Sequence, residues 1–114
     1  MHALVTGATG FIGANLVEAL TQHGWQVRAL HRRSSSSKAL AGLRYDSAIG
    51  DVTDPASLIA AMDGVDVVFH VAAVADYWRS DPDRLMRVNV EGTRNVLQAA
   101  RDRRVRRVVF TSSC

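Results

Sequence analysis

The sequence predicts an α/β protein whose parallel sheet is covered by helices on both faces. A glycine-rich turn at residues 6–13 joins a short apolar run to a segment of helical periodicity, which is typical of a strand that leads into a helix. Two further valine-rich runs lie at 65–71 and 108–110, without the alternation of a half-exposed strand, as in a sheet buried on both sides. Right-handed crossovers between such strands give a doubly wound sheet of order 3-2-1-4-5.

The composition is that of a single globular unit. The 114 residues form one domain at most, and 47% of them are hydrophobic, which is enough for a core. No apolar run reaches the length of a membrane span, and no leader pattern precedes the first strand. The one cysteine, Cys114, allows no internal disulfide, so we expect a cytoplasmic protein. Histidines, the cysteine and carboxylates are not spaced as metal ligands, so we expect no metal.

The first strand and the first helix flank the glycine-rich turn. Residues 3–5 form the strand, and apolar spacing over 12–20 predicts a helix that ends at Gly24. Between them, Gly7 permits a tight turn, Gly10 lets phosphate oxygens approach the backbone and Gly13 lets the helix pack on its strand. The first N–H groups of the helix point outward, where an anionic pyrophosphate can accept them. The alternative is an ordinary flexible turn.

This turn resembles a motif of the extended short-chain dehydrogenase/reductase superfamily, which contains NAD-dependent sugar-nucleotide epimerases and dehydratases and dihydroflavonol-reductase-like enzymes. The matching string is Thr6-Gly7-Ala8-Thr9-Gly10-Phe11-Ile12-Gly13. Its glycines are spaced GxxGxxG, not GxGxxG as in most other dinucleotide folds. The resemblance implies a Rossmann-like domain of which residues 1–114 are the N-terminal part, without the substrate lobe. In this turn it implies cofactor binding by Gly7, Thr9, Gly10, Phe11, Ile12 and Gly13.

The second strand is expected at 26–31, before a basic and serine-rich segment. An NAD-preferring fold usually places an acidic residue here to bind the ribose hydroxyls, whereas this chain has His31 and Arg32. Guanidinium groups suit a 2′-phosphate, and in the dihydroflavonol-reductase-like enzymes that the chain resembles an arginine matching Arg32 contacts it. We therefore expect NADP in preference to NAD, bound by His31, Arg32, Arg33 and Lys38. The alternative is that these cations only solvate a surface loop.

The third strand is expected within residues 43–49, before a Gly-Asp-Val stretch. In the family that the chain resembles, the aspartate of this stretch accepts a hydrogen bond from the adenine amino group, and the next backbone N–H reaches the ring. Asp51 and Val52 take these roles by resemblance, and the alternative for Asp51 is a turn or cap residue. Residues 54–55 then predict the start of a helix as N-cap and first helical residue, and 63–64 predict its end.

Residues 65–71 are predicted as the central strand because their apolar run is nearly unbroken. The end of this strand resembles the segment that lies along the cofactor ribose in extended family members, which implies cofactor binding by Val71, Ala72 and Ala73. His70 is a single histidine at the end of a buried strand, and we expect a structural role and not that of an acid or base. Beyond it, Tyr77 and Trp78 either contact a substrate or pack against a part of the enzyme outside this chain.

The last helix is predicted to start at Asp81-Pro82. Its apolar face consists of Leu85, Val88, Gly92, Val96 and Ala99. Residues 89–93 resemble a family signature in which the asparagine bonds toward main chain beside the central strand, so Asn89 is expected to help order the site. Five arginines between 101 and 107 meet the negative end of the helix dipole. They lack interleaved aromatics and any recognisable motif, so we expect no nucleic-acid binding.

The last strand, 108–110, leads to Thr111-Ser112-Ser113. The resemblance implies that Ser113 is the serine that hydrogen-bonds the reacting substrate oxygen. In the family a Tyr-x-x-x-Lys pair follows on the next helix, with tyrosine as the general acid/base. Neither tyrosine of this chain is followed by lysine at the fourth position. We therefore expect no turnover from these 114 residues alone.

Two functional classes follow from the resemblance. The first is the NAD(P)-binding part of an oxidoreductase or epimerase/dehydratase, which transfers a hydride at an alcohol or carbonyl carbon of a small-molecule substrate held mainly by a lobe outside this chain. The second is a non-catalytic dinucleotide sensor or regulatory module, because fold does not decide function. A Tyr-x-x-x-Lys pair beyond Cys114 would discriminate between them. An uncovered sheet face beside the last strand also predicts a homo-oligomer or a marginally stable chain.

Overall fold

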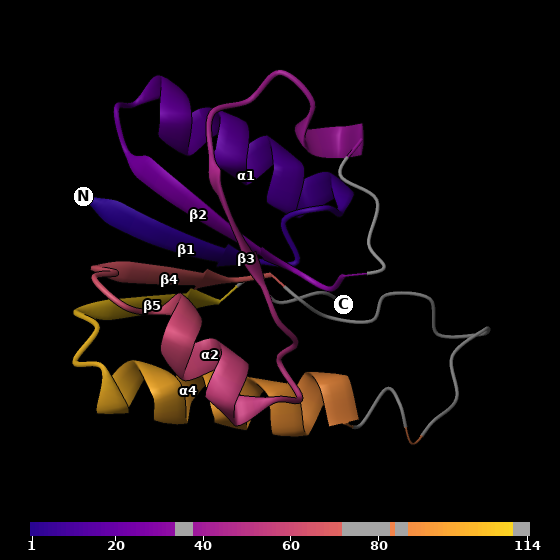
Figure 1. The fold of residues 1–114 in the computed structure, drawn as a ribbon, viewed down its shortest axis with the longest axis vertical. Coiled ribbons are helices and arrows are strands. Elements are labelled where there is room, and N and C mark those ends of the chain that lie inside the picture. The colour runs from indigo at the N-terminus through magenta and orange to yellow at the C-terminus, as the bar shows by residue number, and fades with distance from the viewer. Residues whose placement is uncertain (34–37, 72–82, 84–86, 111–114) are drawn as a thin grey trace.

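The computed structural model of the chain describes residues 1–33, 38–71, 83 and 87–110. Within these residues a five-stranded sheet has the order β3-β2-β1-β4-β5, and all four neighbouring pairs run parallel. The strands are β1 (His2–Thr6), β2 (Gln26–His31), β3 (Asp46–Ile49), β4 (Val67–His70) and β5 (Arg107–Phe110). The predicted strand order is therefore confirmed, and Figure 1 shows the carboxyl ends of the strands along one edge of the sheet.

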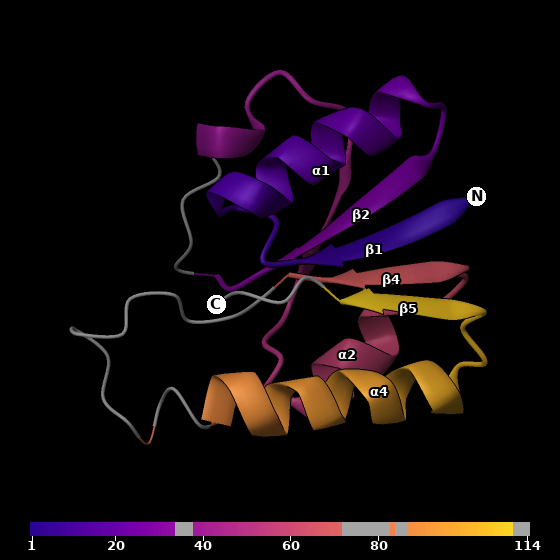
Figure 2. The same cartoon turned by 180° about the vertical axis from the view of Figure 1, so that it is seen from behind.

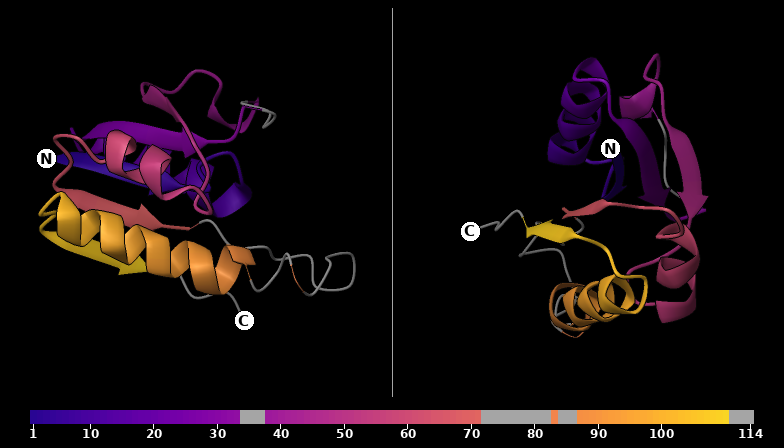
Figure 3. Two further views of the ribbon diagram at one scale, coloured as in Figure 1. Left: turned by 60° about the horizontal axis from the view of Figure 1, so that its bottom comes forward. Right: turned by 90° about the vertical axis from the view of Figure 1, so that its left-hand side faces the viewer.

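Helices cover both faces of the sheet (Figures 1 and 2). One face carries α1 (Phe11–Gln22) and the short 3₁₀ helix η1 (Lys38–Leu40). The opposite face carries α2 (Pro55–Ala61) and α4 (Gly92–Asp102), and a π-helical turn, η2 (Arg87–Glu91), leads into α4. Figure 3 shows α2 and α4 side by side beneath the sheet, in direct contact. The architecture is thus a three-layer sandwich that separates two cores.

Successive residues of the central strand β1 enter opposite cores. Ala3 and Val5 are fully buried against α1, whereas Leu4 is fully buried in the core beneath α2 and α4. Because side chains alternate between the two faces of a strand and both faces are covered, every position favours an apolar residue. This arrangement explains the continuous apolar runs of the sequence.

The last helix follows its prediction only in part. Gly92, Val96 and Ala99 are buried as the apolar spacing predicted. The predicted start at Asp81-Pro82 and the position of Leu85 lie outside the described residues, as does the side chain of Val88. The first described turn is π-helical, at Arg87–Glu91. Wider π turns interrupt the 3.6-residue period of an α-helix, and α4 continues from this turn at Gly92.

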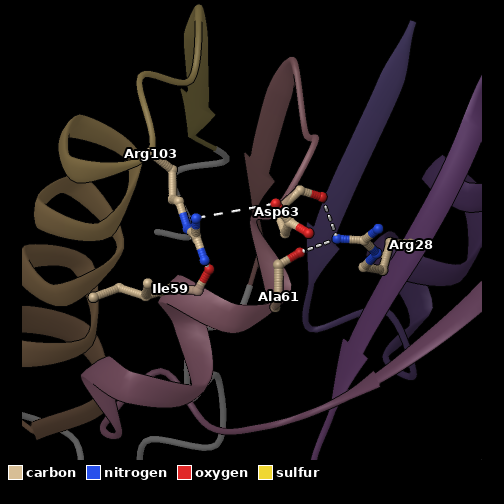
Figure 4. Close-up of polar contacts among 5 residues, drawn as sticks. All are labelled: Arg28, Ile59, Ala61, Asp63 and Arg103. Carbon is tan, nitrogen blue, oxygen red and sulfur yellow. Dashed lines mark hydrogen bonds and ion pairs between the residues drawn. The ribbon is translucent and has the colours of Figure 1, made fainter.

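Two arginines hold the carboxyl end of α2 (Figure 4). From β2, Arg28 Nη1 donates to the carbonyl oxygens of Ala61 at 2.5 Å and Asp63 at 2.8 Å. From the end of α4, Arg103 Nε donates to the carbonyl oxygen of Ile59 at 3.0 Å, and its Nη1 lies 4.0 Å from Asp63 Oδ1. The last carbonyls of a helix lack partners within the helix and attract cations. Arg103 therefore serves the end of α2 and not only that of its own helix.

In the part of the chain that the structure describes, no helix combines the length and the apolar character that crossing a membrane requires.

Candidate functional site

The candidate site lies where β1 and its two neighbours end. The strand order reverses at β1, since β2 follows it on one side and β4 on the other, and their connecting helices cover opposite faces of the sheet (Figure 1). In open parallel sheets, ligands bind outside the carboxyl ends of the strands at such a reversal. Most of the predicted cofactor residues that the structure describes follow the ends of β1, β2 and β4, and Asp51 and Val52 follow the end of β3.

The three glycines of the turn have different roles. Gly7 has a φ of 65°, a left-handed conformation that side chains disfavour. A Cβ added at Gly13 would lie 2.8 Å from the Ala8 Cα and would overlap the Gly7 carbonyl. Gly10, in contrast, has a φ of −82° and a ψ of 173°, and a Cβ there would lie 3.5 Å from the Gly7 oxygen, which is an ordinary contact. The fold itself therefore requires Gly7 and Gly13, whereas packing among the described residues does not require a glycine at position 10.

The turn also presents backbone donors. Gly10 N–H bonds back to the Gly7 carbonyl at 3.1 Å, and the first i→i−4 bond of α1 runs from Ala14 N–H to the Gly10 carbonyl at 2.9 Å. The N–H groups of residues 11–13 precede that bond and have no partner within the helix. The Phe11 and Ile12 side chains are 84% and 55% exposed, so they do not anchor the turn in a core. Unpaired donors, a helix dipole and a missing side chain together fit a pyrophosphate.

The basic residues follow β2 directly. Arg32 and Arg33 are exposed, and His31 Nδ1 lies 3.1 Å from the Arg32 carbonyl oxygen. Lys38 is exposed at the start of η1. The His31 carbonyl accepts the Gly50 N–H at 3.0 Å, which joins this strand end to the turn after β3. The structure thus brings His31, Arg32 and Arg33 to the same sheet edge as the glycine turn.

Asp51 forms a turn in this structure. Its Oδ1 accepts the N–H of Thr53 at 3.0 Å and the Thr53 hydroxyl at 2.9 Å. The Ser57 hydroxyl accepts the Asp51 N–H at 3.1 Å and lies 2.8 Å from the Asp54 carbonyl. These contacts are those of the turn residue that the sequence left open as an alternative. Recognition of an adenine by Asp51 stays a prediction.

Val52 can contribute only its backbone to the site. Its side chain is 5% exposed and packs in the core beneath α2. Its carbonyl oxygen accepts a hydrogen bond of 3.0 Å from Asn95 Nδ2 of α4. The predicted role of Val52 was that of a backbone N–H, so the buried side chain is compatible with it.

His70 is buried at the end of β4 between two threonines. Its Nδ1 lies 2.9 Å from Thr6 Oγ1 and its Nε2 lies 3.1 Å from Thr93 Oγ1. Burial lowers the pKa of His70 below its ordinary value, because a charged ring is poorly solvated there. The Thr6 hydroxyl also accepts the N–H of Val71 at 3.0 Å. The predicted structural role of His70 agrees with these contacts, which satisfy both ring nitrogens.

Asn89 enters the same group of contacts through its main chain. Its carbonyl oxygen accepts the Thr93 hydroxyl at 2.7 Å. The predicted site residues Ala72, Ala73 and Ser113 lie outside the described residues, as do Tyr77 and Trp78. Among residues 1–33, 38–71, 83 and 87–110, no three histidine, cysteine or carboxylate side chains gather as metal ligands would.

Comparison with known protein families identifies the family to which this fold and site belong. Residues 3–114 match the NAD dependent epimerase/dehydratase family. The chain belongs to this family. A family match over nearly the whole chain confirms the resemblance to short-chain dehydrogenases/reductases that rested on the glycine turn.

Three relatives illustrate the range of the epimerase/dehydratase family. Sterol demethylase protein B of Methylococcus capsulatus is 50% identical over 113 residues, which are 99% of this chain and 34% of that protein. A putative dihydroflavonol 4-reductase of Synechocystis is 48% identical over 109 residues, 96% of this chain and 32% of that protein. A short-chain dehydrogenase/reductase superfamily protein of Agrobacterium tumefaciens, solved with bound NAD, superposes with a TM-score of 0.84 at 39% identity over 99% of this chain and 33% of that one. The chain thus spans about a third of the length of these relatives.

Sequence reasoning missed four side chains that hold residues of the candidate site. Ser57 and Asn95 hold the turn after β3, and Thr6 and Thr93 hold the His70 ring. The bonds that Asn95, Thr6 and Thr93 make to Val52 and His70 join residues 43, 64 and 23 positions apart in sequence, so no local pattern indicates them. A signal did exist for Thr6, because it is a polar residue at the end of an apolar strand, next to the glycine turn.

Proposed function

We propose that this chain is the dinucleotide-binding part of an NAD(P)-dependent oxidoreductase or epimerase/dehydratase, with NADP preferred over NAD. The contrast between Gly10 and Gly13 carries the proposal. A fold that needed glycine only for packing would have no use for a bare backbone at Gly10, where an added Cβ would make only an ordinary contact of 3.5 Å with the Gly7 oxygen. Three N–H groups at the start of α1 lie beside it and suit an anion.

Different residues of this chain would bind different parts of the cofactor. The turn at residues 7–13 binds the pyrophosphate, and Asp51 with the Val52 backbone receives the adenine. Val71 and the residues after it lie along the nicotinamide ribose, and Ser113 orients the substrate oxygen. When bound, the nicotinamide ring accepts or donates a hydride at an alcohol or carbonyl carbon. The general acid/base would come from the helix that follows Ser113 in the family, and most of the substrate contacts from a lobe outside these residues. We therefore propose that the isolated chain binds cofactor without turnover.

The preference for NADP rests on the strand end at β2. Arg32 and Arg33 are exposed there, and no carboxylate that would repel a 2′-phosphate occupies residues 26–33. Hydrogen bonds from a guanidinium to a phosphate are charge-assisted and bidentate. Relatives of this chain include a protein solved with NAD, so a direct comparison of the two cofactors is required. A small-molecule substrate and a cytoplasmic location are proposed on the sequence alone.

Titration of NADPH and NADH into the wild-type chain and Arg32→Ala tests this proposal. One charged phosphate contact contributes about 1.5–3 kcal/mol, so Arg32→Ala should weaken NADPH binding about 10- to 100-fold and leave NADH within about two-fold. Arg101→Ala is the matched control, because Arg101 is equally exposed but lies at the far end of α4. Equal losses for both cofactors would overturn the NADP preference, and no binding of either would overturn the proposed function.

A further inference from the structure

His70 is the point at which four elements of the sheet edge meet. Its side chain is 5% exposed, and its two nitrogens lie within hydrogen-bond distance of Thr6 on β1 and Thr93 on α4. Its ring also packs edge-on against Phe110 of β5, with centroids 5.9 Å apart and planes at 88°. The register explains this meeting, because Thr6, His70 and Phe110 are paired at the last rung of β1, β4 and β5.

The hydrogen bonds around His70 fix the direction of each donor. Thr93 has one hydroxyl hydrogen, and the Asn89 carbonyl, 2.7 Å away, accepts it. The Thr93 oxygen must then accept from His70, which requires a hydrogen on Nε2. Nδ1 of the neutral ring is therefore the acceptor, and the Thr6 hydroxyl is its donor. The Thr6 oxygen in turn accepts the Val71 N–H. The hydrogen bonds therefore run in one direction, from the residue after β4 through Thr6, His70 and Thr93 to the Asn89 carbonyl in η2.

Three residues around His70 lie in or beside segments of the proposed cofactor site. Thr6 directly precedes Gly7, the first residue of the phosphate-binding turn. Val71 begins the segment proposed to lie along the ribose. Phe110 stands three residues before Ser113. The His70 ring thus contacts Thr6 and Phe110 directly, and the Thr6 hydroxyl holds the Val71 N–H in turn. Segments that bind one ligand must keep a fixed spacing for the ligand to span them.

We propose that His70 is a positioning residue of the dinucleotide site, which acts as a neutral ring with its hydrogen on Nε2 and sets the spacing between the glycine turn and the end of β4. The inference rests on the proposed function and adds to it. If His70 only stabilised the fold, the loss of one of its contacts would affect cofactor binding no more than the loss of any other core contact. A positioning role requires that the loss of one hydrogen bond to His70 weakens cofactor binding more than a loss of core packing that lowers the stability of the fold by as much or more.

Substitutions at Thr93 separate these two roles. Thr93→Val keeps the shape of the side chain but removes the hydroxyl that accepts from Nε2, and Thr93→Ser restores that hydroxyl. The packing control is Val96→Ala, because Val96 is fully buried on the same helix and lies in the core beneath α2. We expect NADPH affinity to fall about five-fold in Thr93→Val, to return to within about two-fold of wild type in Thr93→Ser, and to stay within about two-fold in Val96→Ala, although that variant loses more stability.

Nitrogen-15 NMR of the His70 ring gives an independent readout. We expect a protonated Nε2 and a bare Nδ1 in the wild type and in Thr93→Ser, and a mixture of both tautomers in Thr93→Val. A hydrogen on Nδ1 in the wild type overturns the inference, and so does NADPH affinity that follows stability across the three variants. A wild-type chain that binds no dinucleotide overturns the proposed function and the inference with it, whereas unchanged affinity in Thr93→Val beside a binding wild type overturns the inference alone.

Discussion

Alanine at Gly10 and alanine at Gly13 are predicted to have opposite effects, although the two positions are three residues apart in one turn. At Gly13 the added Cβ lies 2.8 Å from the Ala8 Cα and overlaps the Gly7 carbonyl, and both are backbone atoms that cannot rotate away. Overpacking of this kind costs about 1–3 kcal/mol or more, while alanine regains about 1 kcal/mol of helix propensity. Since the contact involves rigid backbone, we expect a net loss of about 2 kcal/mol.

At Gly10 the same change meets only an ordinary contact of 3.5 Å. The backbone angles, φ −82° and ψ 173°, suit any residue, so Gly10→Ala should cost no more than about 1 kcal/mol as a less favourable N-cap. The methyl group would instead occupy the approach to the first N–H groups of α1. Loss of one charged hydrogen bond costs about 1.5–3 kcal/mol, so NADPH and NADH should both bind about 10- to 100-fold more weakly.

Thermal unfolding and calorimetric titration measure the two effects separately. A domain of this size loses about 4 °C of Tm per kcal/mol, so Gly13→Ala should melt about 8 °C lower and Gly10→Ala within about 4 °C of wild type. Unchanged cofactor affinity in a folded Gly10→Ala would refute the phosphate site. A wild-type Tm in Gly13→Ala would refute the packing account of the turn.

Three further predictions concern stability and assembly. Arg28→Met removes the donor to the carbonyls at the end of α2. After allowance for solvent screening of a half-buried guanidinium, this change should lower the free energy of unfolding in urea by about 1–2 kcal/mol, whereas the exposed-site control Arg101→Met should cost nothing. Equal urea midpoints for the two variants would contradict the capping role of Arg28. Because the folded-state pKa of His70 is lowered, the unfolded chain takes up the proton first as the pH falls. The stabilisation that the neutral His70 ring provides is therefore complete above the ordinary pKa of about 6.5, and it declines below that pH by at most about 1.4 kcal/mol per pH unit. Urea unfolding between about pH 7.5 and about pH 5.5 should show this loss of stability in the wild type but not in His70→Asn, and parallel pH slopes for the two proteins would contradict it. The edge position of β5 and the 46% exposure of Phe110 predict that the isolated chain self-associates or is marginally stable, and a stable monomer in sedimentation would contradict this. We also expect the isolated chain to have no turnover, which cofactor oxidation over a panel of carbonyl substrates would contradict.

The sequence predicted most reliably what local physics decides. The glycine turn, the continuous apolar strands and the Pro55 helix start each depend on neighbours in sequence, and the structure confirms them. The strand order followed once right-handed crossovers were assumed. Arg28 shows the limit of such reasoning. Its partners at the end of α2 and just beyond it lie 33 and 35 residues away in sequence, and nothing near Arg28 identifies them.

The site was predicted by motif, while its supporting contacts were not. His70 was expected to be structural, but its partners could not be identified from the sequence, because Thr6 and Thr93 lie 64 and 23 residues away. Asp51 was assigned to the cofactor by resemblance, and its contacts with Thr53 became visible only in the structure. Roles that belong to a short motif can be predicted from the sequence, whereas hydrogen bonds between distant elements become visible only in the folded structure.

The central claim is that the start of α1 binds the pyrophosphate of a nicotinamide dinucleotide. Titration of NADPH into the nitrogen-15-labelled chain, followed by amide NMR, tests it residue by residue. The account predicts saturable shifts that are largest for the N–H groups of residues 10–13, with smaller shifts at Arg32 and Val71 and none at residues 101–107. Saturable shifts centred on the arginines at 101–107, or no shifts at residues 10–13, would contradict it.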